Sequence, residues 1–203
     1  MSSSAARESA ASDPSPGTIA ELSAARLPAS FFQRDAETVA RALIGCALVH
    51  RRRAGVIVET EAYVGPHDLA CHARVGRTER TSVMFGAGGK SYIYLCYGVH
   101  EMFNIVTGTE GDGQAVLIRA IAPLLGMGDD PKVGRGPGKV TAALLLDRRQ
   151  NRRDLARGGL FVAPALVPPA IDVGPRIGVA YAGAWASKPL RFWWRGHPSV
   201  SRA

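Results

Sequence analysis

The rest of the chain is organised around the stretch VIVETEAYVGPHDLACHA, residues 56–73, which begins as a predicted strand. It opens on three β-branched residues, 56–58, and its apolar run ends at a Gly65-Pro66 pair, which predicts a strand followed by a turn. Side chains alternate along a strand, so two carboxylates and an aromatic ring are expected to share a face. The members of that face are Ile57, Glu59, Glu61 and Tyr63.

The small-residue run 69–73 then brings back a histidine, His72. This arrangement has two interpretations. The first is a surface strand end with solvated glutamates, because strand ends are often acidic. The second is an active site, in which a carboxylate performs acid–base chemistry and Tyr63 and His72 form the walls. The pattern alone leaves both open.

Outward from this strand the chain reads as a series of hairpins. Strands are expected at 46–50, 56–62, 91–97, 99–107 and 114–122, and short strands and connections at 154–157, 160–163, 176–181 and 190–194. A helix is expected from residue 36, where Asp35 is a suitable N-cap, to Gly45, and another over 139–146. Strands that follow one another directly disfavour a doubly wound fold. The predicted fold class is mixed α/β (α+β), a single domain with a curved, mainly antiparallel β-sheet flanked by helices.

Residues 1–22 are rich in Ser, Ala and Pro and lack a lasting periodicity. Such a segment holds too few apolar residues to pack, so we predict a disordered N-terminal tail over 1–22 and a folded domain over 23–203. The alternative is a weak helix around Ile19–Arg26.

Composition limits the partners and the compartment. The 203 residues carry a formal net charge of +8 and are 46% hydrophobic, which suggests a globular domain that binds a polyanion, most simply nucleic acid. An arginine-rich proteome would give the same charge. Cys46, Cys71 and Cys96 lack metal or redox spacing and read as small buried hydrophobes in a reducing compartment. We find no membrane-spanning run and no signal peptide, and expect a cytoplasmic protein.

A basic loop follows the central strand. Residues 74–82, RVGRTERTS, carry Arg74, Arg77 and Arg80 among small hydroxyl residues. Such a loop suits phosphate contacts, which position a protein on nucleic acid without reading its sequence. An ordinary exposed loop is the alternative, and beside a carboxylate site we favour DNA contacts. The arginine cluster at 51–53 is favoured as a solvated turn.

Aromatic residues concentrate in the strand expected at 91–97. Tyr92 and Tyr94 should share one face, and Tyr97 precedes Gly98, where a tight turn would point it outward. Packing, with the hydroxyl satisfied, is the commoner role of a lone tyrosine. The three tryptophans, Trp185, Trp193 and Trp194, read as core or sheet residues.

Polar residues inside apolar strands need partners. Asn104 must be hydrogen-bonded if it is buried. Arg119 must either extend its charged end to water or find an anion, which would be a phosphate, the catalytic carboxylate or a structural ion-pair partner. The glycine-rich lead 136–138 into Lys139 can receive phosphate on its backbone N–H groups, although most such loops are only turns.

A series of segments, taken in their order along the chain, resembles the alkyladenine (3-methyladenine) DNA glycosylase family of the mammalian and bacterial type. The resemblance covers about residues 27–195. The matching segments are VETEAYVGP at 58–66, His72, MFG at 84–86, YIYLCYG at 92–98, Asn104, GDG at 111–113, LIRAIAP at 117–123, GPGK at 136–139 and RIGVAYAGAWASKPLRFW at 176–193. The chain departs from the family pattern at Glu79-Arg80-Thr81, at Glu101, where an aromatic is usual, and in a shorter 127–138 loop.

The resemblance implies a monofunctional glycosylase of base excision repair. Such an enzyme flips alkylated or deaminated purines out of duplex DNA and hydrolyses the N-glycosidic bond with a carboxylate-activated water, leaving an abasic site. It implies Glu61 as the catalytic residue, held by Arg119. The implied base pocket is Tyr63, His72, Tyr94 and Asn104, the implied wedge is Tyr97, and the implied DNA contacts are Arg74, Arg77, Arg80 and Lys139. No metal or organic cofactor is implied, and the expected enzyme is a monomer that acts on double-stranded DNA without a membrane partner.

Two other functions remain open. A non-catalytic nucleic-acid binding module of the same fold would keep the basic face and Tyr97, but would have no reason to keep Glu61, Asn104 and Arg119 together. A nucleoside hydrolase acting on small molecules would need neither the arginine loop nor the wedge. No lysine stands where it would suggest a Schiff-base nucleophile, so lyase activity is not expected.

Overall fold

The two carboxylates lie on β2 (Arg53–Tyr63), an inner strand of one nine-stranded sheet in the computed structural model, which describes residues 17–168 and 170–201. The strand order is β3-β4-β5-β2-β1-β7, and each recorded pair is antiparallel. The other strands on this path are β1 (Cys46–His50), β3 (Ser91–Cys96), β4 (His100–Thr107), β5 (Gln114–Leu125) and β7 (Leu160–Pro164). The predicted mixed α/β class with a mainly antiparallel sheet is confirmed.

The sheet forks along β2. One edge of β2 pairs with β5 over nearly its whole length, while the other edge pairs first with β1 and then, at Glu59–Glu61, with β9 (Arg191–Trp194). β8 (Ile171–Gly174) pairs with β9, and β6 (Gly134–Arg135) with β5. The two carboxylates therefore lie in a stretch with partners on both sides, not at a free strand end. The interpretation of a solvated acidic strand end is wrong.

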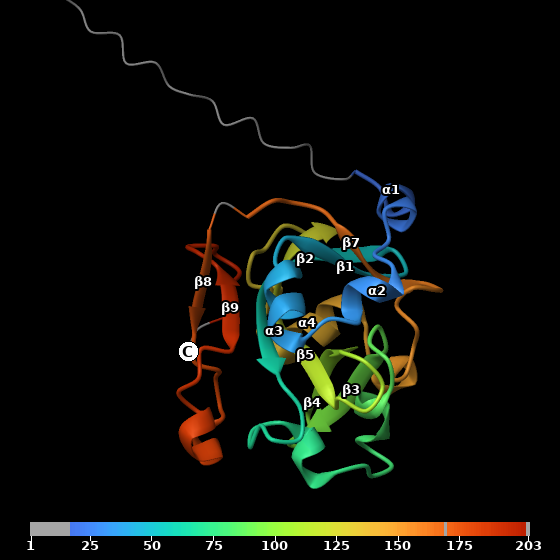
Figure 1. The fold of residues 1–203 in the computed structure, drawn as a ribbon. Helices are drawn as coiled ribbons and strands as arrows, with labels where there is room; N and C mark the ends of the chain where they lie inside the picture. Colours follow the sequence, from blue (N-terminus) through green and yellow to red (C-terminus); the bar gives the residue numbers. More distant parts are fainter. Residues whose placement is uncertain (1–16, 169, 202–203) are drawn as a thin grey trace, which may run out of the picture.

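The two predicted helices, α3 and α4, are present, and a further short helix, α2, precedes them. α3 (Ala36–Ala42) begins at Asp35, whose side chain accepts a hydrogen bond from Thr38 N–H at 2.8 Å. α4 (Pro137–Leu144) begins two residues earlier than expected, because proline suits the first turn of a helix. Residues of α2 (Ala29–Phe32), α3 and α4 all belong to the main core cluster, together with residues of β2, β4 and β5. Figure 1 shows these helices lying beside the strands of the sheet.

The expected alternation along β2 is wrong for Ile57 and Val58. The register of β2 against β5 shifts between Ile57 and Glu59, and again between Glu59 and Thr60. A bulge inserts an extra residue and changes which face the following side chains occupy. Ile57 therefore packs in the main core with Ala62, while Glu59 and Glu61 remain together on the opposite face, both against one arginine.

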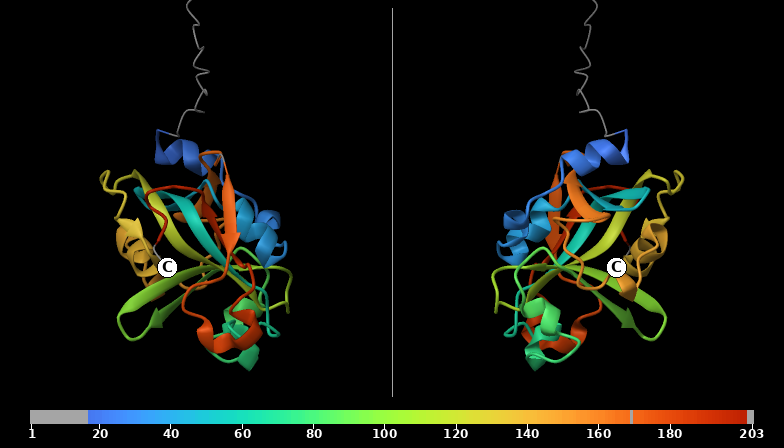
Figure 2. Two further views of the ribbon diagram at one scale, coloured as in Figure 1. Left: turned by 90° about the vertical axis from the view of Figure 1, so that its left-hand side faces the viewer. Right: turned by 90° about the vertical axis from the view of Figure 1, so that its right-hand side faces the viewer.

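The hairpin of β3 and β4 is tighter than expected. Tyr97 and Gly98 both have positive φ, 50° and 71°, and form its tip, so β3 ends at Cys96 and β4 begins at His100. Backbone in this region is normal for glycine and uncommon for tyrosine, and it turns the Tyr97 side chain into solvent, 95% exposed. Figure 2 shows this hairpin projecting from the body of the molecule.

Four short 3-10 helices lie in the connections between the strands of the described chain. They are η1 (His72–Val75), η2 (Ser82–Phe85), η3 (Arg148–Gln150) and η4 (Ala180–Trp185). Apolar contacts of Ala70 with Val179 and Ala182 bring the η1 loop and η4 to the same end of the molecule (Figure 2). The segment 176–181, for which short strands and connections were expected, is a loop that runs into η4.

The N-terminal helix that the sequence left as an alternative is present. α1 (Ile19–Ala24) begins with a capping box formed by Thr18 and Glu21, and its Leu22 side chain is 1% exposed against β1 and β7. The predicted tail boundary at residue 22 is therefore too late, because one apolar side chain with a suitable pocket is enough to dock a short helix. Residues 1–16 of the predicted tail lie outside the described residues.

The three cysteines are free, with Cys46 and Cys71 buried and Cys96 half-buried, as expected of small hydrophobes. Within the described ranges, none of the helices has the length and hydrophobicity of a membrane-spanning segment.

Candidate active site

Glu61 lies in the second half of β2 with its side chain completely buried. Its Oε1 atom accepts a hydrogen bond from Ile177 N–H at 2.7 Å and lies 3.2 Å from Arg119 Nη1. Its Oε2 atom accepts one from the Tyr63 hydroxyl at 3.0 Å. A carboxylate offers about four lone-pair positions, so these three donors leave one for a water molecule. Glu61 is thus an oriented acceptor with one position to spare.

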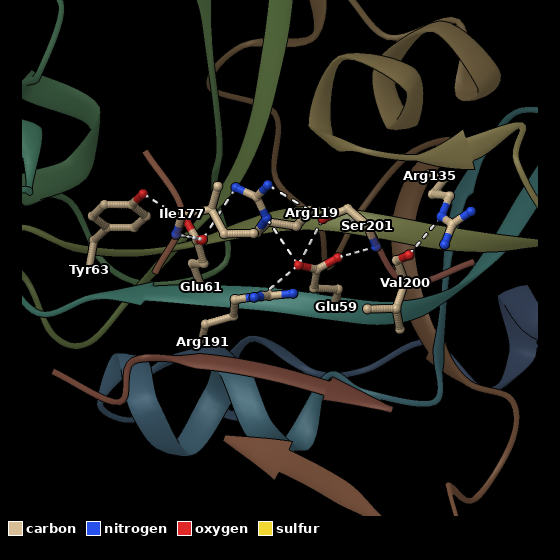
Figure 3. Close-up of polar contacts among 9 residues, drawn as sticks. All are labelled: Glu59, Glu61, Tyr63, Arg119, Arg135, Ile177, Arg191, Val200 and Ser201. Carbon is tan, nitrogen blue, oxygen red and sulfur yellow. Dashed lines mark hydrogen bonds and ion pairs between the residues drawn. The ribbon is translucent and has the colours of Figure 1, made fainter. Parts of the chain in front are cut away.

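Glu59, two residues earlier, has a different environment. Its Oε1 atom accepts hydrogen bonds from Arg191 Nε at 2.7 Å, the Ser201 hydroxyl at 3.0 Å and Arg119 Nε at 3.1 Å, and its Oε2 atom accepts one from Ser201 N–H at 2.7 Å. Figure 3 shows Arg119 between the two glutamates of β2, with Arg191 reaching Glu59 from β9. Four donors occupy the Glu59 carboxylate, which marks it as a structural ion-pair partner.

The electrostatics of Glu61 suit a general base. Burial raises the pKa of Glu61, and the nearby charge of Arg119, the Ile177 N–H and the Tyr63 hydroxyl oppose that rise, while the charge of Glu59 adds to it. A carboxylate with a raised pKa accepts a proton more readily near neutral pH. Burial also raises the pKa of Tyr63 well above its usual value, so its hydroxyl stays protonated and donates to Glu61.

A cavity of about 410 Å³ opens above Glu61, within the size range of small-molecule sites. Its lining includes Glu61, Tyr63, His72, Arg80, Tyr94, Tyr97, Met102, Leu117, Arg119, Pro137, Ile177 and Tyr181. Glu59 is not among the described residues that line it. This difference in access separates the two glutamates, which strand alternation alone does not.

A smaller pocket of about 50 Å³ adjoins this cavity and shares several of its aromatic walls. It is lined by Tyr63, Ala70, His72, Met84, Tyr92, Tyr94, Asn104, Ala115 and Tyr181. All four residues predicted for the base pocket, Tyr63, His72, Tyr94 and Asn104, thus meet around one space. Asn104 is nearly buried, and its Nδ2 atom donates to the carbonyl oxygen of Tyr92 at 3.2 Å, which satisfies the expected need for a hydrogen bond.

His72 is held edge-on to two tyrosines. Its Nδ1 atom lies 2.9 Å from the Tyr92 hydroxyl, and its ring centroid is 4.5 Å from that of Tyr94. Burial lowers the pKa of His72 to about 4, and the positive charges of Arg80 and Arg74 act in the same direction. His72 is therefore neutral at physiological pH and contributes a flat wall with one hydrogen bond, not a charge.

The arginine loop divides between the cavity and the surface. The Arg80 guanidinium lies 5.0 Å from the Tyr94 ring centroid and lines the cavity, so it reaches into the site. Arg74 and Arg77 are exposed outside the cavity, and Arg77 Nη2 donates to the carbonyl oxygen of Phe85 at 3.3 Å. Lys139 is exposed in the first turn of α4, two residues after Pro137, which lines the cavity. Of these cations, Arg80 lines the cavity itself, and Lys139 lies close in sequence to a residue that does.

A second buried ion pair supports the site and was not anticipated. Arg176 donates to the two carboxylate oxygens of Asp68 at 2.6 and 2.8 Å, and its guanidinium lies 4.7 Å from the Tyr63 ring centroid. The pair thereby fixes the loop that presents Ile177 N–H to Glu61. Its partners are separated by 108 residues, and neither residue belongs to a local pattern that links them.

Other residues of the site carried weaker signals. Tyr92 and Tyr94 are two residues apart on one strand, so the sequence predicts that they share a face. The hydrogen bond between Tyr92 and His72 joins distant parts of the chain and has no such signal. Tyr181 is an exposed aromatic on η4 that lines both spaces. Ile177 contributes through its backbone, for which a sequence holds no side-chain signal.

A buried, oriented carboxylate below an aromatic cavity with a cationic rim is typical of hydrolases that act on a flat ring such as a nucleobase. The family model for methylpurine-DNA glycosylase matches residues 30–198. The chain belongs to the methylpurine-DNA glycosylase family.

Several bacterial relatives are similar over most of their length. A protein of Myxococcus xanthus (strain DK1622) is 50% identical over 182 residues, covering 87% of this chain and 93% of that protein. A protein of Anaeromyxobacter dehalogenans (strain 2CP-1) is 51% identical over 183 residues (87% and 86%), and one of Legionella pneumophila (strain Corby) is 43% identical over 183 residues (87% and 98%). Each is named "Putative 3-methyladenine DNA glycosylase".

Proposed function

We propose that Glu61 activates a water molecule that hydrolyses the N-glycosyl bond of a damaged purine flipped out of duplex DNA. Membership of the family makes the chain a DNA glycosylase, a hydrolase of N-glycosyl bonds in base excision repair. The observation that carries the residue assignment is that Glu61 lines the cavity while three fixed donors hold its carboxylate and leave it one acceptor position.

The chemistry follows from this geometry. A water hydrogen-bonded to Glu61 gives up a proton to the carboxylate as its oxygen attacks the sugar C1′, and the bond from C1′ to the base nitrogen breaks with its electron pair leaving on the base. The transition state resembles an oxocarbenium ion, so the negative charge of Glu61 also stabilises it. Arg119 keeps the carboxylate oriented and ionised for both roles.

The aromatic walls fit a purine that carries damage. Tyr63, His72 and Tyr94 offer flat faces for stacking, and alkylated purines that bear a positive charge gain further from contact with electron-rich rings. A positively charged base is also a better leaving group, so the removal of such a base needs little acid catalysis. Asn104, whose side chain lies in the small pocket, is placed to discriminate against an exocyclic amino group of the undamaged base.

The activity is tested directly by strand cleavage at alkaline pH after incubation of the protein with a duplex. Parallel duplexes carry 3-methyladenine, 7-methylguanine, hypoxanthine or 1,N6-ethenoadenine, and an undamaged duplex is the control. We expect alkali-sensitive sites in at least one damaged duplex, and intact strands before alkali treatment, since a monofunctional enzyme leaves the backbone whole. Cleavage of free nucleosides with no cleavage of any duplex would instead identify a nucleoside hydrolase.

Salt dependence tests the arginine loop. Each phosphate that a cation neutralises contributes roughly 0.9 to the slope of log affinity against log salt. We therefore expect Arg77→Ala to flatten this slope by about one unit for damaged and undamaged duplexes alike. The matched control is Arg52→Ala, an exposed arginine in the turn at the opposite end of β2, where the slope should not change. An unchanged slope in Arg77→Ala would place the loop away from the DNA.

The N-terminal region is tested by truncation. We expect a chain that starts at Leu27 to excise bases at the full-length rate, because α1 docks on β1 and β7, away from the cavity lining. Its melting temperature should fall, since it loses the buried Leu22, worth about 1.5–3 kcal/mol. A chain that starts at Gly17 keeps this helix and serves as the control. A large loss of single-turnover rate in the shorter chain would show that the deleted region engages DNA.

A further inference from the structure

The last described residues of the chain contact the buried carboxylates, although they are far from them in the sequence. Ser201 donates twice to the completely buried Glu59, from its backbone N–H to Oε2 at 2.7 Å and from its hydroxyl to Oε1 at 3.0 Å. Arg119 Nη2 in turn donates to the Ser201 hydroxyl oxygen at 3.4 Å. One serine therefore contacts both the glutamate and the arginine that stand next to Glu61 (Figure 3).

The segment that carries this serine is itself held in place. Arg135 Nε donates to the Val200 carbonyl oxygen at 2.8 Å, and the Val200 side chain packs against the apolar cluster that contains Val56, Val58 and Ala120. Val200 thus packs on β2 and β5, the strands that carry Glu59, Glu61 and Arg119.

Arg119 is fixed by three partners at once. Its Nε atom contacts Glu59 at 3.1 Å, its Nη1 atom contacts Glu61 at 3.2 Å and its Nη2 atom contacts Ser201. A planar guanidinium with a separate partner for each nitrogen cannot rotate without losing a contact. The four buried charges of Glu59, Glu61, Arg119 and Arg191 also sum to zero, so a shift of Arg119 toward either glutamate leaves the other less neutralised.

We propose that Val200–Ser201 is a positioning element of the active site, in which Ser201 holds Glu59 and Arg119 so that Arg119 keeps the Glu61 carboxylate oriented and ionised. This inference rests on the proposed role of Glu61 as the base. Ser201 does not line the cavity among the described residues, so it acts through Arg119 and does not touch the reacting atoms.

The physical consequence is a shift in the titration of Glu61. Without the serine hydroxyl, Glu59 loses a donor and attracts Arg119 more strongly, and Arg119 loses one of its three anchors. Both changes draw Arg119 away from Glu61. The pKa of Glu61 then rises, because the positive charge of Arg119 no longer offsets the effect of burial as strongly. The charged and titratable groups that face Glu61 from the elements around it are Arg119, Tyr63, Glu59, Arg191, Arg176, and, across the cavity, His72, Arg80, Tyr94, Tyr97 and Tyr181.

The sign of the effect follows from the role of a base. A general base works only when it is unprotonated, so the rate falls as pH drops through the pKa of Glu61. A higher pKa moves this acid limb of the pH–rate profile to higher pH. The loss of rate is then largest at acid pH and disappears on the alkaline plateau.

The test is single-turnover base excision from a damaged duplex that the wild-type protein cleaves, followed from about pH 5 to about pH 9. For Ser201→Ala we expect the acid limb to move up by roughly half to one unit, which lowers the rate on that limb about three- to tenfold. Ser201→Thr keeps the hydroxyl and should keep the wild-type limb. The matched control is Ser199→Ala, because the buried hydroxyl of Ser199 has no hydrogen-bond partner within the described residues.

The outcomes separate this proposal from the one on which it rests. An unchanged acid limb in Ser201→Ala, with Glu61→Gln inactive, overturns the positioning role and leaves the assignment of the base intact. A loss that is equal at every pH and accompanied by a lower melting temperature also overturns it, since that pattern marks a purely structural serine. Activity in Glu61→Gln would reject the base itself. The folded fraction of each variant is followed by circular dichroism over the same pH range, because acid unfolding would also lower the rate at low pH. A limb that moves while the folded fraction stays constant supports the positioning role, and a limb that moves only in step with unfolding overturns it.

Discussion

Glu61→Gln is expected to abolish base excision while damaged duplex is still bound with nearly wild-type affinity. The amide keeps the shape of the side chain and one oxygen that accepts from the Ile177 N–H or the Tyr63 hydroxyl. It cannot accept a proton from water, and it cannot stabilise positive charge on the sugar. General-base catalysis alone contributes about 10²–10⁴-fold, so a loss of at least this size is expected in the single-turnover rate.

Glu59→Gln is the informative comparison, since it makes the same chemical change two residues away. Glu59 neutralises Arg119 and Arg191 in a fully buried site, and breaking a buried pair costs about 3–5 kcal/mol. We therefore expect Glu59→Gln mainly to lower the melting temperature, whereas Glu61→Gln should alter it much less. Full excision by Glu61→Gln together with inactive but stable Glu59→Gln would reverse the assignment.

Tyr97→Ser is expected to slow excision from a stable duplex far more than excision from single-stranded DNA. Extruding a nucleotide costs a few kcal/mol in lost stacking and pairing, and a side chain that enters the vacated space recovers part of this cost. Tyr97 is suited to that task because it stands at the tip of a projecting hairpin, 95% exposed, and still lines the cavity that holds Glu61. If the ring recovers about 1.4–2.8 kcal/mol, the duplex rate falls roughly 10- to 100-fold.

The measurement is single-turnover excision of the same damaged base in duplex and in single strand. A single strand has little pairing to overcome, so Tyr97→Ser should leave that rate close to wild type, whereas Glu61→Gln should disable both substrates alike. Leu145→Ser is a matched control, since Leu145 is also an exposed apolar residue with positive φ, 54°, but lies at the end of α4 beside the β1–β2 turn. Equal losses of Tyr97→Ser on both substrates would assign the ring to the base pocket or to packing.

Local chemistry accounts for the parts of the fold that could be predicted. The β-branched run 56–58 within β2, the glycine that follows Tyr97 and the N-cap at Asp35 act through the backbone of their own neighbourhood. Strand, turn and helix start therefore appear nearly where expected, with β2 starting three residues earlier, at Arg53. The boundaries shifted where a special conformation intervened, as at Pro137, which starts α4 early.

The departures have long-range causes. The bulge between Ile57 and Glu59 arises from how β2 pairs with β5, which is more than 50 residues away in the sequence, and it reverses which side of the strand Ile57 occupies. The capping box of Thr18 and Glu21 favours α1 locally, but the helix is held because Leu22 finds a pocket built from β1 and β7. Propensity and periodicity describe neighbours along the chain and are silent about such pockets.

The same division holds at the site. The sequence by itself determined that this chain has a mixed α/β sheet, that two glutamates and a tyrosine follow one another on a central strand, and that aromatic and basic residues accompany them, because strand period and turn chemistry are local. Only the tertiary structure decided which glutamate is available for chemistry. Glu59 receives Arg191 and Ser201, and Glu61 receives Ile177 N–H and an open cavity. These partners come from more than 100 residues further along the chain, and burial, hydrogen bonding and pKa depend on which atoms meet in space, not on their order in the sequence.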